Sequence, residues 1–166
     1  MAKPAPQRRY WLFKSEPEVY SFSDLLAERG RRTSWNGVRN YQARNLLRDE
    51  IAVGDGVLFY HSSTDPLAVV GTCRVVRAGY PDETAFDRGS PYYDEGSDRA
   101  APRWFTVDIE AVCAFPEPVT RARMQAEPAL AGMMLLRRGS RLSVQPVTAA
   151  EWRAVLRLAG VREEDA

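Results

Sequence analysis

Short apolar runs alternate with polar turns along this chain, and the alternation predicts several short strands. Residues 10–13 form an apolar, aromatic run that is typical of a buried strand. Residues 57–61 follow a glycine turn and are separated from residues 68–76 by a polar turn, so the two segments predict an antiparallel hairpin. Residues 104–113 alternate apolar and polar side chains, which indicates a strand with one buried face.

Capping patterns mark the expected helices. A Ser-x-x-Asp pattern at residues 21–24 predicts a short helix that ends at Gly30. Asn40 is a favourable N-terminal cap residue for a second helix. A Thr-x-x-Glu pattern at residues 148–151 predicts the last helix, which carries its apolar residues on one face and stops at Gly160.

The order of these elements favours a single domain of the α+β class. Short strands in hairpins do not suit a doubly wound parallel sheet, and a small mixed β barrel with short helices packed around it fits better. At 166 residues the chain has the length of one domain. We predict this domain over residues 10–160, between a disordered N-terminal arm at residues 1–9 and a charged tail at residues 161–166 that frays.

Composition narrows the classes of function. No apolar run approaches the roughly 20 residues that cross a bilayer, and the first residues lack an apolar signal segment, so we expect a cytoplasmic protein that binds no membrane. Cys73 and Cys113 lie far apart and the chain has one histidine, so we expect no metal site. The sequence has no glycine-rich phosphate loop, and we expect a monomer without a cofactor.

The stretch at residues 35–45 carries the most suggestive chemistry. From Arg29 to Arg48 the chain has six arginines and no acidic residue, although its formal net charge is +1. An aromatic side chain, amides and arginines placed together can stack on a base, read its edge and bind phosphate. A helix that starts at Asn40 would add free backbone N–H groups. The same stretch is also explained by Trp35 as a core residue and the arginines as a solvated face.

Two strand ends carry polar side chains. Lys14 and Ser15 follow the first strand just before Pro17, where the chain turns, and they could project into a cleft. His61 lies beside Ser62, but adjacent strand residues point to opposite faces and no second base is present, which disfavours a serine hydrolase. His61 either lines a cleft or simply ends its strand.

An acidic polar stretch extends from Tyr80 to Arg103 and contains six acidic residues and a pair of tyrosines at residues 92 and 93. A loop of this length is either functional or mobile. It could fold over the basic segment at residues 29–48 or act as an electrostatic gate. It could equally be a solvated loop that its two tyrosines anchor.

Four ordered motifs resemble the EVE domain, the thymocyte nuclear protein 1-like family. They are YWLFKSEP at residues 10–17, WNGVRNYQARN at 35–45, LFYHS at 58–62 and SRLSVQPV at 140–147. The resemblance spans about residues 10 to 158. It implies a PUA-like pseudobarrel, related to the YTH domains that read methylated adenine in RNA, and it implies binding to nucleic acid that carries a modified base.

The resemblance also implies the residues of a base pocket. These are Lys14, Ser15, Trp35, Asn40, Tyr41, Tyr60, His61, Ser62, Trp104, Leu142 and Ser143. Among them we expect Ser15, Asn40 and His61 to read the edge of the base. For the phosphates we expect Arg39, Arg44 and Arg141.

A reader of this kind needs no catalytic group. A base inside a duplex must be flipped out at a cost of a few kcal/mol, and stacking on an aromatic side chain returns roughly 1–3 kcal/mol. We therefore predict a non-catalytic domain that reads a methylated or hydroxymethylated cytosine or a similar base. On this hypothesis, Trp35→Ala weakens binding of the modified base and leaves folding largely intact.

Two alternatives remain open from the sequence. Some PUA-like relatives of the ASCH type hydrolyse modified nucleosides, and Lys14, Ser15 and Glu16 could supply a base and a polar clamp. The other alternative is a reader of modified RNA. The near-neutral net charge does not distinguish DNA from RNA.

Overall fold

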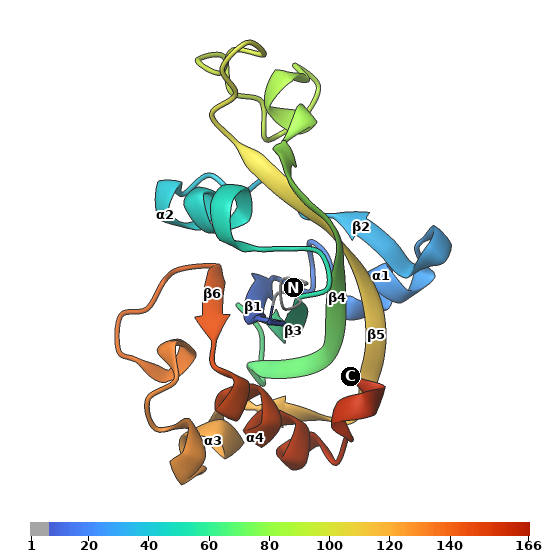
Figure 1. The fold of residues 1–166 in the computed structure, drawn as a ribbon, viewed down its shortest axis with the longest axis vertical. Helices are drawn as coiled ribbons and strands as arrows, with labels where there is room; N and C mark the ends of the chain where they lie inside the picture. Colours follow the sequence, from blue (N-terminus) through green and yellow to red (C-terminus); the bar gives the residue numbers. More distant parts are fainter. Residues whose placement is uncertain (1–6) are drawn as a thin grey trace, which may run out of the picture.

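Six strands form one mixed sheet in the computed structural model, which describes residues 7–166 (Figure 1). The order across the sheet is β2-β5-β4-β3-β1-β6. The strands are β1 (Tyr10–Ser15), β2 (Arg32–Ser34), β3 (Gly56–His61), β4 (Ala68–Pro81), β5 (Phe105–Thr120) and β6 (Val144–Val147).

The sheet combines both kinds of strand pairing. β1 and β3 are parallel, whereas β3 with β4, β4 with β5, and β1 with β6 are antiparallel. The predicted hairpin is therefore confirmed, although β4 extends to Pro81, five residues beyond its predicted end. In the described part of the chain β2 and β6 remain edge strands, so the expected pseudobarrel is a curved sheet that does not close.

Four short α-helices and several single turns pack around this sheet, which confirms the α+β class. The α-helices are α1 (Phe22–Ala27), α2 (Tyr41–Asn45), α3 (Arg121–Gln125) and α4 (Ala149–Ala159). A π-helical turn, η2 (Leu46–Glu50), follows α2 directly. The 3-10 turns are η1 (Arg29–Arg31), η3 (Glu83–Phe86), η4 (Pro128–Leu130), η5 (Met134–Leu136) and η6 (Glu163–Asp165). Within residues 7–166 no helix has the length and apolar character to span a membrane.

The predicted caps are present, with one correction. Ser21 and Thr148 each form a reciprocal capping box, and Gly160 ends α4 with a left-handed φ of 71°. The prediction that α1 ends at Gly30 is wrong, because Glu28 adopts an extended conformation and stops the helix at Ala27. Gly30 instead supplies the positive φ of the turn that follows.

Apolar side chains pack on both faces of the sheet, which gives two core clusters. Successive residues of a strand point to opposite faces. Accordingly, Trp11 and Phe13 pack in the first cluster with residues of α1 and α2, and Leu12 packs in the second with residues of α4. This double burial explains why β1 reads as an uninterrupted apolar run.

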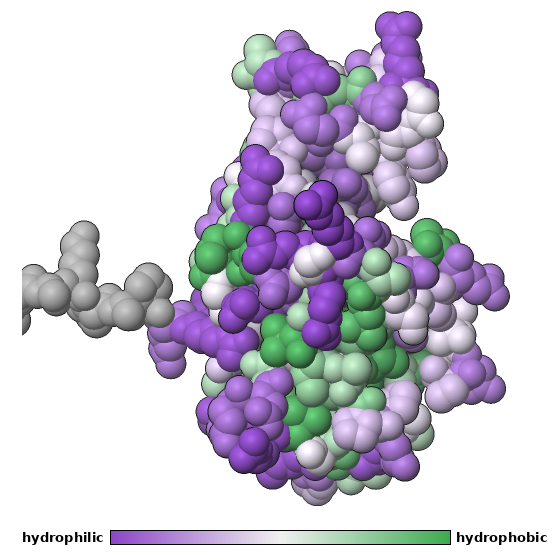
Figure 2. Space-filling view, turned by 90° about the vertical axis from the view of Figure 1, so that its right-hand side faces the viewer, coloured by the Kyte–Doolittle hydropathy of each residue, from purple (hydrophilic) through white to green (hydrophobic). Residues whose placement is uncertain are grey.

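The ends of β4 and β5 carry a separate lobe formed by residues 82–104, which we call the distal lobe (Figure 1, top). A long antiparallel ribbon supports it, since Tyr80 pairs with Thr106 and Pro81 with Phe105. The face seen in Figure 2 shows that this lobe is largely hydrophilic. The polar stretch predicted as a loop is therefore a projection of the longest strands.

The structure describes part of each predicted flexible end. Residues 1–6 of the predicted arm lie outside the described residues. Arg8 is part of the domain, since its Nε donates to the Gly54 carbonyl at 2.9 Å and its guanidinium lies over the ring of Trp152. In the tail, residues 163–165 form the turn η6 and Arg162 pairs with Asp165, and the fraying stays a prediction.

Removing the cap of α4 should weaken the second core. Thr148→Ala takes away the oxygen that accepts the Glu151 N–H, and we expect the free energy of unfolding to fall by about 1 kcal/mol. Urea denaturation measures this change. Thr148→Ser keeps the acceptor and should lose much less; equal losses in the two variants would contradict the role of the cap.

Candidate functional site

A cleft of about 590 Å³ opens between the end of β1, the segment that joins β2 to α2, and the distal lobe. We call it the main cleft. Fourteen residues line it: Lys14, Ser15, Glu16, Val19, Tyr20, Thr33, Ser34, Trp35, Asn36, Gly37, Val38, Arg39, Tyr92 and Ser143. It therefore unites three regions that the sequence singled out separately.

Trp35 forms an aromatic wall of the main cleft and also belongs to the first core. Its exposed fraction is only 9%, and its ring centroid lies 5.3 Å from that of Phe13 and 5.5 Å from that of Phe59. The ring of Tyr20 meets it edge-on at 6.5 Å. Both interpretations of Trp35 thus hold together: it packs in the core and also lines the cleft.

Lys14, Ser15 and Ser143 lie together where β1 meets the segment before β6. The Lys14 N–H donates to the Ser143 carbonyl at 2.9 Å, and the Lys14 ammonium reaches the Ser140 carbonyl at 3.4 Å. Burial, and then the positive charge of Arg121, lower the pKa of Lys14. The Ser15 hydroxyl donates to the Tyr20 carbonyl, so it presents only its acceptor lone pairs to the cleft.

Asp82 ties the distal lobe to the wall of the main cleft. Its carboxylate is fully buried and accepts the Gly37 N–H at 2.9 Å and an Arg39 N–H at 3.0 Å. Arg39 also donates to the Tyr92 carbonyl at 2.7 Å. The acidic stretch therefore folds over the basic segment, which was one of its two predicted arrangements.

Gly37 permits this close approach. Its φ is +87°, and a Cβ at this position would lie 2.6 Å from the ring of Tyr92. A side chain here would force Tyr92 away from the cleft. Gly37 and Tyr92 thus define the border between the basic segment and the distal lobe.

The charge state of Asp82 follows from these contacts. Burial alone would raise the pKa of its carboxyl group, but hydrogen bonds from Gly37, Thr84 and Arg39 outweigh burial and hold the pKa below its ordinary value. Asp82 is therefore ionised at neutral pH, and its charge compensates that of Arg39.

Several predicted pocket residues lie outside the main cleft. Asn40 caps α2, where its Oδ1 accepts the Ala43 N–H at 2.9 Å. Tyr41 is 54% exposed and stacks on Trp104, with ring centroids 5.0 Å apart. Arg44 lies over the Tyr41 ring and donates to a carbonyl of the distal lobe. These residues form a second aromatic surface next to the cleft.

The strand end at residues 60–62 does not line the main cleft. Its contacts are with residues next to the cleft. Tyr60 is buried in the second core. His61 accepts the Phe22 N–H at 3.1 Å through Nε2, and burial lowers its pKa. The Ser62 N–H donates to the Ser15 carbonyl. We therefore place the role of this strand end in holding Ser15 and α1.

Of the three predicted residues in the segment before β6, only one lines the main cleft. Leu142 is half-buried against the first core, Ser143 reaches the cleft, and Arg141 is exposed. The cleft thus contains Lys14, Ser15, Trp35, Arg39 and Ser143 from the predicted set.

Sequence reasoning missed three residues that shape the cleft, namely Tyr20, Gly37 and Asp82. The positive φ of Gly37 had a local signal, since a glycine after Trp35-Asn36 is typical of a turn. The link from Asp82 to the cleft had none, because Gly37 and Arg39 lie more than 40 residues earlier in the chain.

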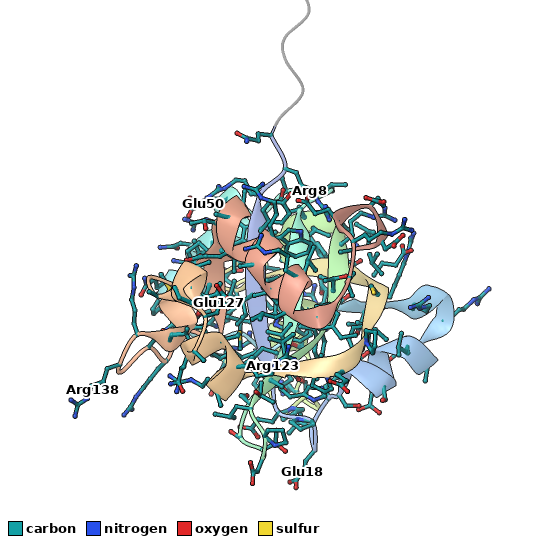
Figure 3. All side chains as sticks on the ribbon, turned by 90° about the horizontal axis from the view of Figure 1, so that it is seen from below. Arg8, Glu18, Glu50, Arg123, Glu127 and Arg138 are labelled. Carbon is teal, nitrogen blue, oxygen red and sulfur yellow. The ribbon has the colours of Figure 1, made fainter. Side chains whose placement is uncertain are left out.

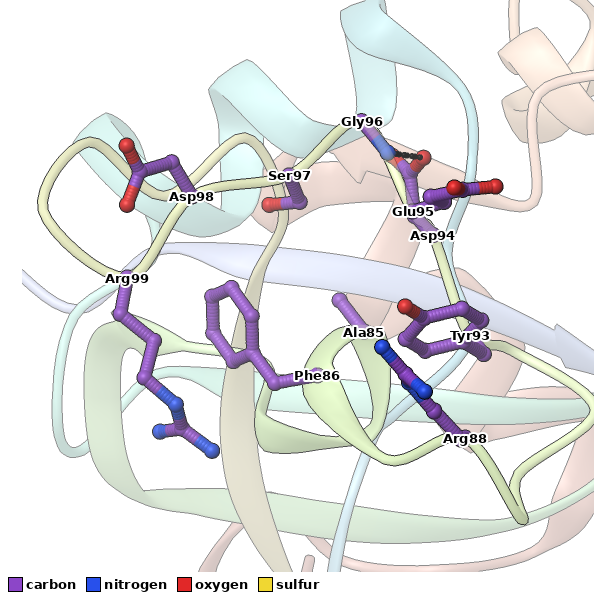
Figure 4. A pocket seen from close by; sticks show the side chains of 10 residues that line it. All are labelled: Ala85, Phe86, Arg88, Tyr93, Asp94, Glu95, Gly96, Ser97, Asp98 and Arg99. Atoms are coloured by element: carbon purple, nitrogen blue, oxygen red, sulfur yellow. Dashed lines mark hydrogen bonds between the residues drawn. The ribbon is translucent and has the colours of Figure 1, made fainter.

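The distal lobe holds a second hollow of about 570 Å³ (Figure 4). Its wall mixes aromatic and charged side chains of both signs, among them Phe86, Tyr93, Glu95 and Arg99. The Arg99 guanidinium lies over the Phe86 ring at 4.5 Å and pairs with Glu83. The hollow contains none of the predicted site residues.

Metal coordination has no support in residues 7–166, where no group of three or more His, Cys, Asp or Glu side chains could hold an ion. The thiol of Cys73 is buried, and burial raises its pKa.

The fold and the main cleft define a small α+β domain with an aromatic, polar cleft at one end of a curved mixed sheet. Residues 9–158 match the model of the EVE domain family. The chain belongs to the EVE domain family.

Relatives and solved structures agree with this assignment. Human thymocyte nuclear protein 1 is 38% identical over 165 residues, which cover 90% of this chain and 73% of that protein. A hypothetical protein from Leishmania major has a TM-score of 0.86 at 40% identity, with 93% of this chain and 96% of that chain covered. The human THYN1 protein in complex with 5-methylcytosine containing DNA has a TM-score of 0.85 at 37% identity, with 93% and 99% covered.

A more distant structure shares the fold alone. The ASCH protein from Zymomonas mobilis has a TM-score of 0.56 at 12% identity, over 92% of this chain and 96% of that chain.

Because Trp35 packs in the core, the expectation that Trp35→Ala leaves folding intact needs revision. We now expect this change to lower the free energy of unfolding by about 3 kcal/mol or more. Trp35→Phe retains an aromatic ring and should lose less. Chemical denaturation of both variants measures the difference, and an unchanged stability of Trp35→Ala would show that its core contacts contribute little.

Asp82→Asn should destabilise the protein in a pH-dependent way. Because the pKa of Asp82 is depressed in the folded state, its stabilisation is complete above about pH 4 and is lost as the pH falls further. We expect a loss of about 1–3 kcal/mol at pH 7 that shrinks below pH 4. Denaturation at several pH values measures it.

Glu95→Gln, on the exposed surface of the same lobe, is the matched control and should change stability little. A loss for Asp82→Asn that stays constant down to pH 2 would contradict the role of the ionised carboxylate.

Proposed function

We propose that this domain binds nucleic acid without catalysis and reads a modified base in the main cleft. The observation that supports it most is the match, over 93% of this chain, to a human protein solved in complex with 5-methylcytosine containing DNA. The main cleft, at about 590 Å³, falls in the usual range for small-molecule sites. Its wall combines aromatic side chains with polar groups from three segments.

The cleft offers contacts for both the face and the edge of a base. Trp35 and Tyr20 supply aromatic surface. The lone pairs of the Ser15 hydroxyl can accept from an amino group, and the major-groove edge of cytosine carries such a donor at N4. Asn36 is exposed at the cleft and can donate and accept. This arrangement suits a flipped pyrimidine.

Discrimination of the modification would come from apolar contact. A methyl group that packs against Trp35 and Val38, which both line the cleft, would gain about 1–3 kcal/mol, which corresponds to roughly 10- to 200-fold. A wrong base edge would leave buried polar groups unpaired and bind less well. We propose a methylated or hydroxymethylated cytosine, or a similar base, as the ligand.

The two alternatives predict different chemistry at the same cleft. A reader of modified RNA would contact the 2′-hydroxyl in addition to the base. A hydrolase of the ASCH type rests on likeness of fold alone. The hydroxyl of Ser15 donates to Tyr20, and His61 accepts from Phe22, so the apo geometry pairs neither group with a catalytic partner. We therefore favour the reader.

A binding screen tests the proposal. Fluorescence anisotropy with modified and unmodified oligonucleotides, DNA and RNA, single- and double-stranded, should show about 10-fold or greater preference for one modification at fixed salt. Asn36→Ala should reduce that preference, since it removes a polar group from the cleft.

Asn45→Ala is the matched control, because Asn45 is exposed at the end of α2 and does not line the cleft. Equal affinity for every modified and unmodified oligonucleotide would overturn the proposed function. Release of a free base or a converted nucleoside in the same samples would overturn the non-catalytic part.

A further inference from the structure

The two sides of the main cleft carry opposite charge. On one side lies the distal lobe, whose residues 82–103 include six acidic residues and three arginines. On the other side lies the segment before β6, within a stretch from residue 128 to residue 150 that has no acidic residue and three arginines. A polyanion that approaches the cleft is therefore repelled by one side and attracted by the other.

The basic segment at residues 29–48 does not offset the lobe, because most of its arginines already have partners. Arg39 pairs with Asp82, and Arg44 donates to the Arg103 carbonyl. Arg32 pairs with Glu110, and Arg48 with Asp49. A phosphate that bound to Arg39 or Arg44 would have to displace the contacts by which these arginines hold the distal lobe in place.

We call residues 137–141 the basic loop. Its arginines, unlike most of those at residues 29–48, are largely free of partners within the described residues. Arg138 and Arg141 are exposed and form no ion pair within residues 7–166, and Arg137 donates to the Gly132 carbonyl at 3.2 Å. Figure 3 shows the Arg138 side chain extending away from the body of the domain. Their charges are therefore available to a partner in solution.

Hydrogen bonds fix the basic loop beside the main cleft. The buried Gln145 amide donates to the Leu142 carbonyl at 2.8 Å and to the Ser140 hydroxyl at 3.1 Å. Lys14 reaches the Ser140 carbonyl from β1. Because Ser143 lines the cleft, the Cα of Arg141 lies within about 7 Å of a cleft residue's Cα.

The base of the loop adds further positive potential. The ammonium of Lys14 lies 3.4 Å from the Ser140 carbonyl, within the basic loop. The rim from Lys14 to Arg141 thus concentrates positive charge at one edge of the cleft.

We propose that the basic loop binds the phosphodiester backbone of the strand whose base enters the main cleft, with Arg138 and Arg141 as the phosphate contacts. This inference rests on the proposed function. Arg39 and Arg44 hold the distal lobe and are no longer assigned as phosphate contacts. Arg141 keeps that role, and Arg138 joins it. The strand then leaves the cleft over the basic loop and away from the acidic lobe.

The salt dependence of binding tests this assignment. For the double variant Arg138→Ala with Arg141→Ala, the slope of log affinity against log salt should fall in magnitude by about 1.4 for single strands or about 1.8 for duplexes. Affinity should fall equally for modified and unmodified oligonucleotides, because phosphate contacts carry no sequence information. Anisotropy titrations from low to moderate salt measure both quantities.

The matched control is Arg153→Ala with Arg157→Ala, which removes the same charge from two exposed arginines of α4. The control should keep the wild-type slope, and an unchanged melting temperature confirms that both variants fold. Equal slopes in wild type and the basic-loop variant, or equal changes in the two double variants, would overturn the assignment.

The outcomes separate this inference from the proposed function. If the wild type shows no preference for modified oligonucleotides but the basic-loop variant still loses slope, the reader function fails and the phosphate contacts stand. If the wild type prefers a modified oligonucleotide but the slope of the basic-loop variant does not change, the reader function stands and the phosphate contacts fail. No binding to any oligonucleotide would overturn both.

Discussion

The buried carboxylate of Asp82 is the contact on which the arrangement of the cleft depends. A charge taken out of water is stable only when hydrogen bonds and an opposite charge replace the lost solvation. Asp82 obtains these from Gly37, Arg39 and Thr84. The turn after β2 and the distal lobe are thereby joined, and Tyr92 can rest against Gly37 at the cleft border.

The sheet supplies the rigid part of the site. β1 and β3 run parallel, so their carboxyl ends lie at the same edge, where the Ser62 N–H donates to the Ser15 carbonyl. Alternation along β1 then separates the polar groups, since Phe13 and Ser15 share one face and Lys14 faces the other. The face of Ser15 opens into the main cleft beside Trp35, while the ammonium of Lys14 reaches the loop before β6.

The charge pattern around the cleft differs from the charge pattern along the sequence. The segment at residues 29–48 is the most basic in the chain, yet its arginines serve mainly to hold the distal lobe and neighbouring strands. The shorter run at residues 137–141 keeps its charge exposed. A local excess of arginine therefore indicates a site only when the acidic partners elsewhere in the fold are known.

The sequence by itself determined the α+β class, most strand positions, the caps at Ser21, Asn40 and Thr148, and five of the residues that line the cleft. These features depend on alternation, capping and contiguous motifs, which act over a few residues. Only the tertiary structure decided that His61 supports the backbone, that Trp35 belongs to both core and cleft, and that Asp82 neutralises Arg39. These outcomes depend on burial and on partners more than 35 residues away along the chain, or on whether a side chain is already engaged, and no local pattern encodes either.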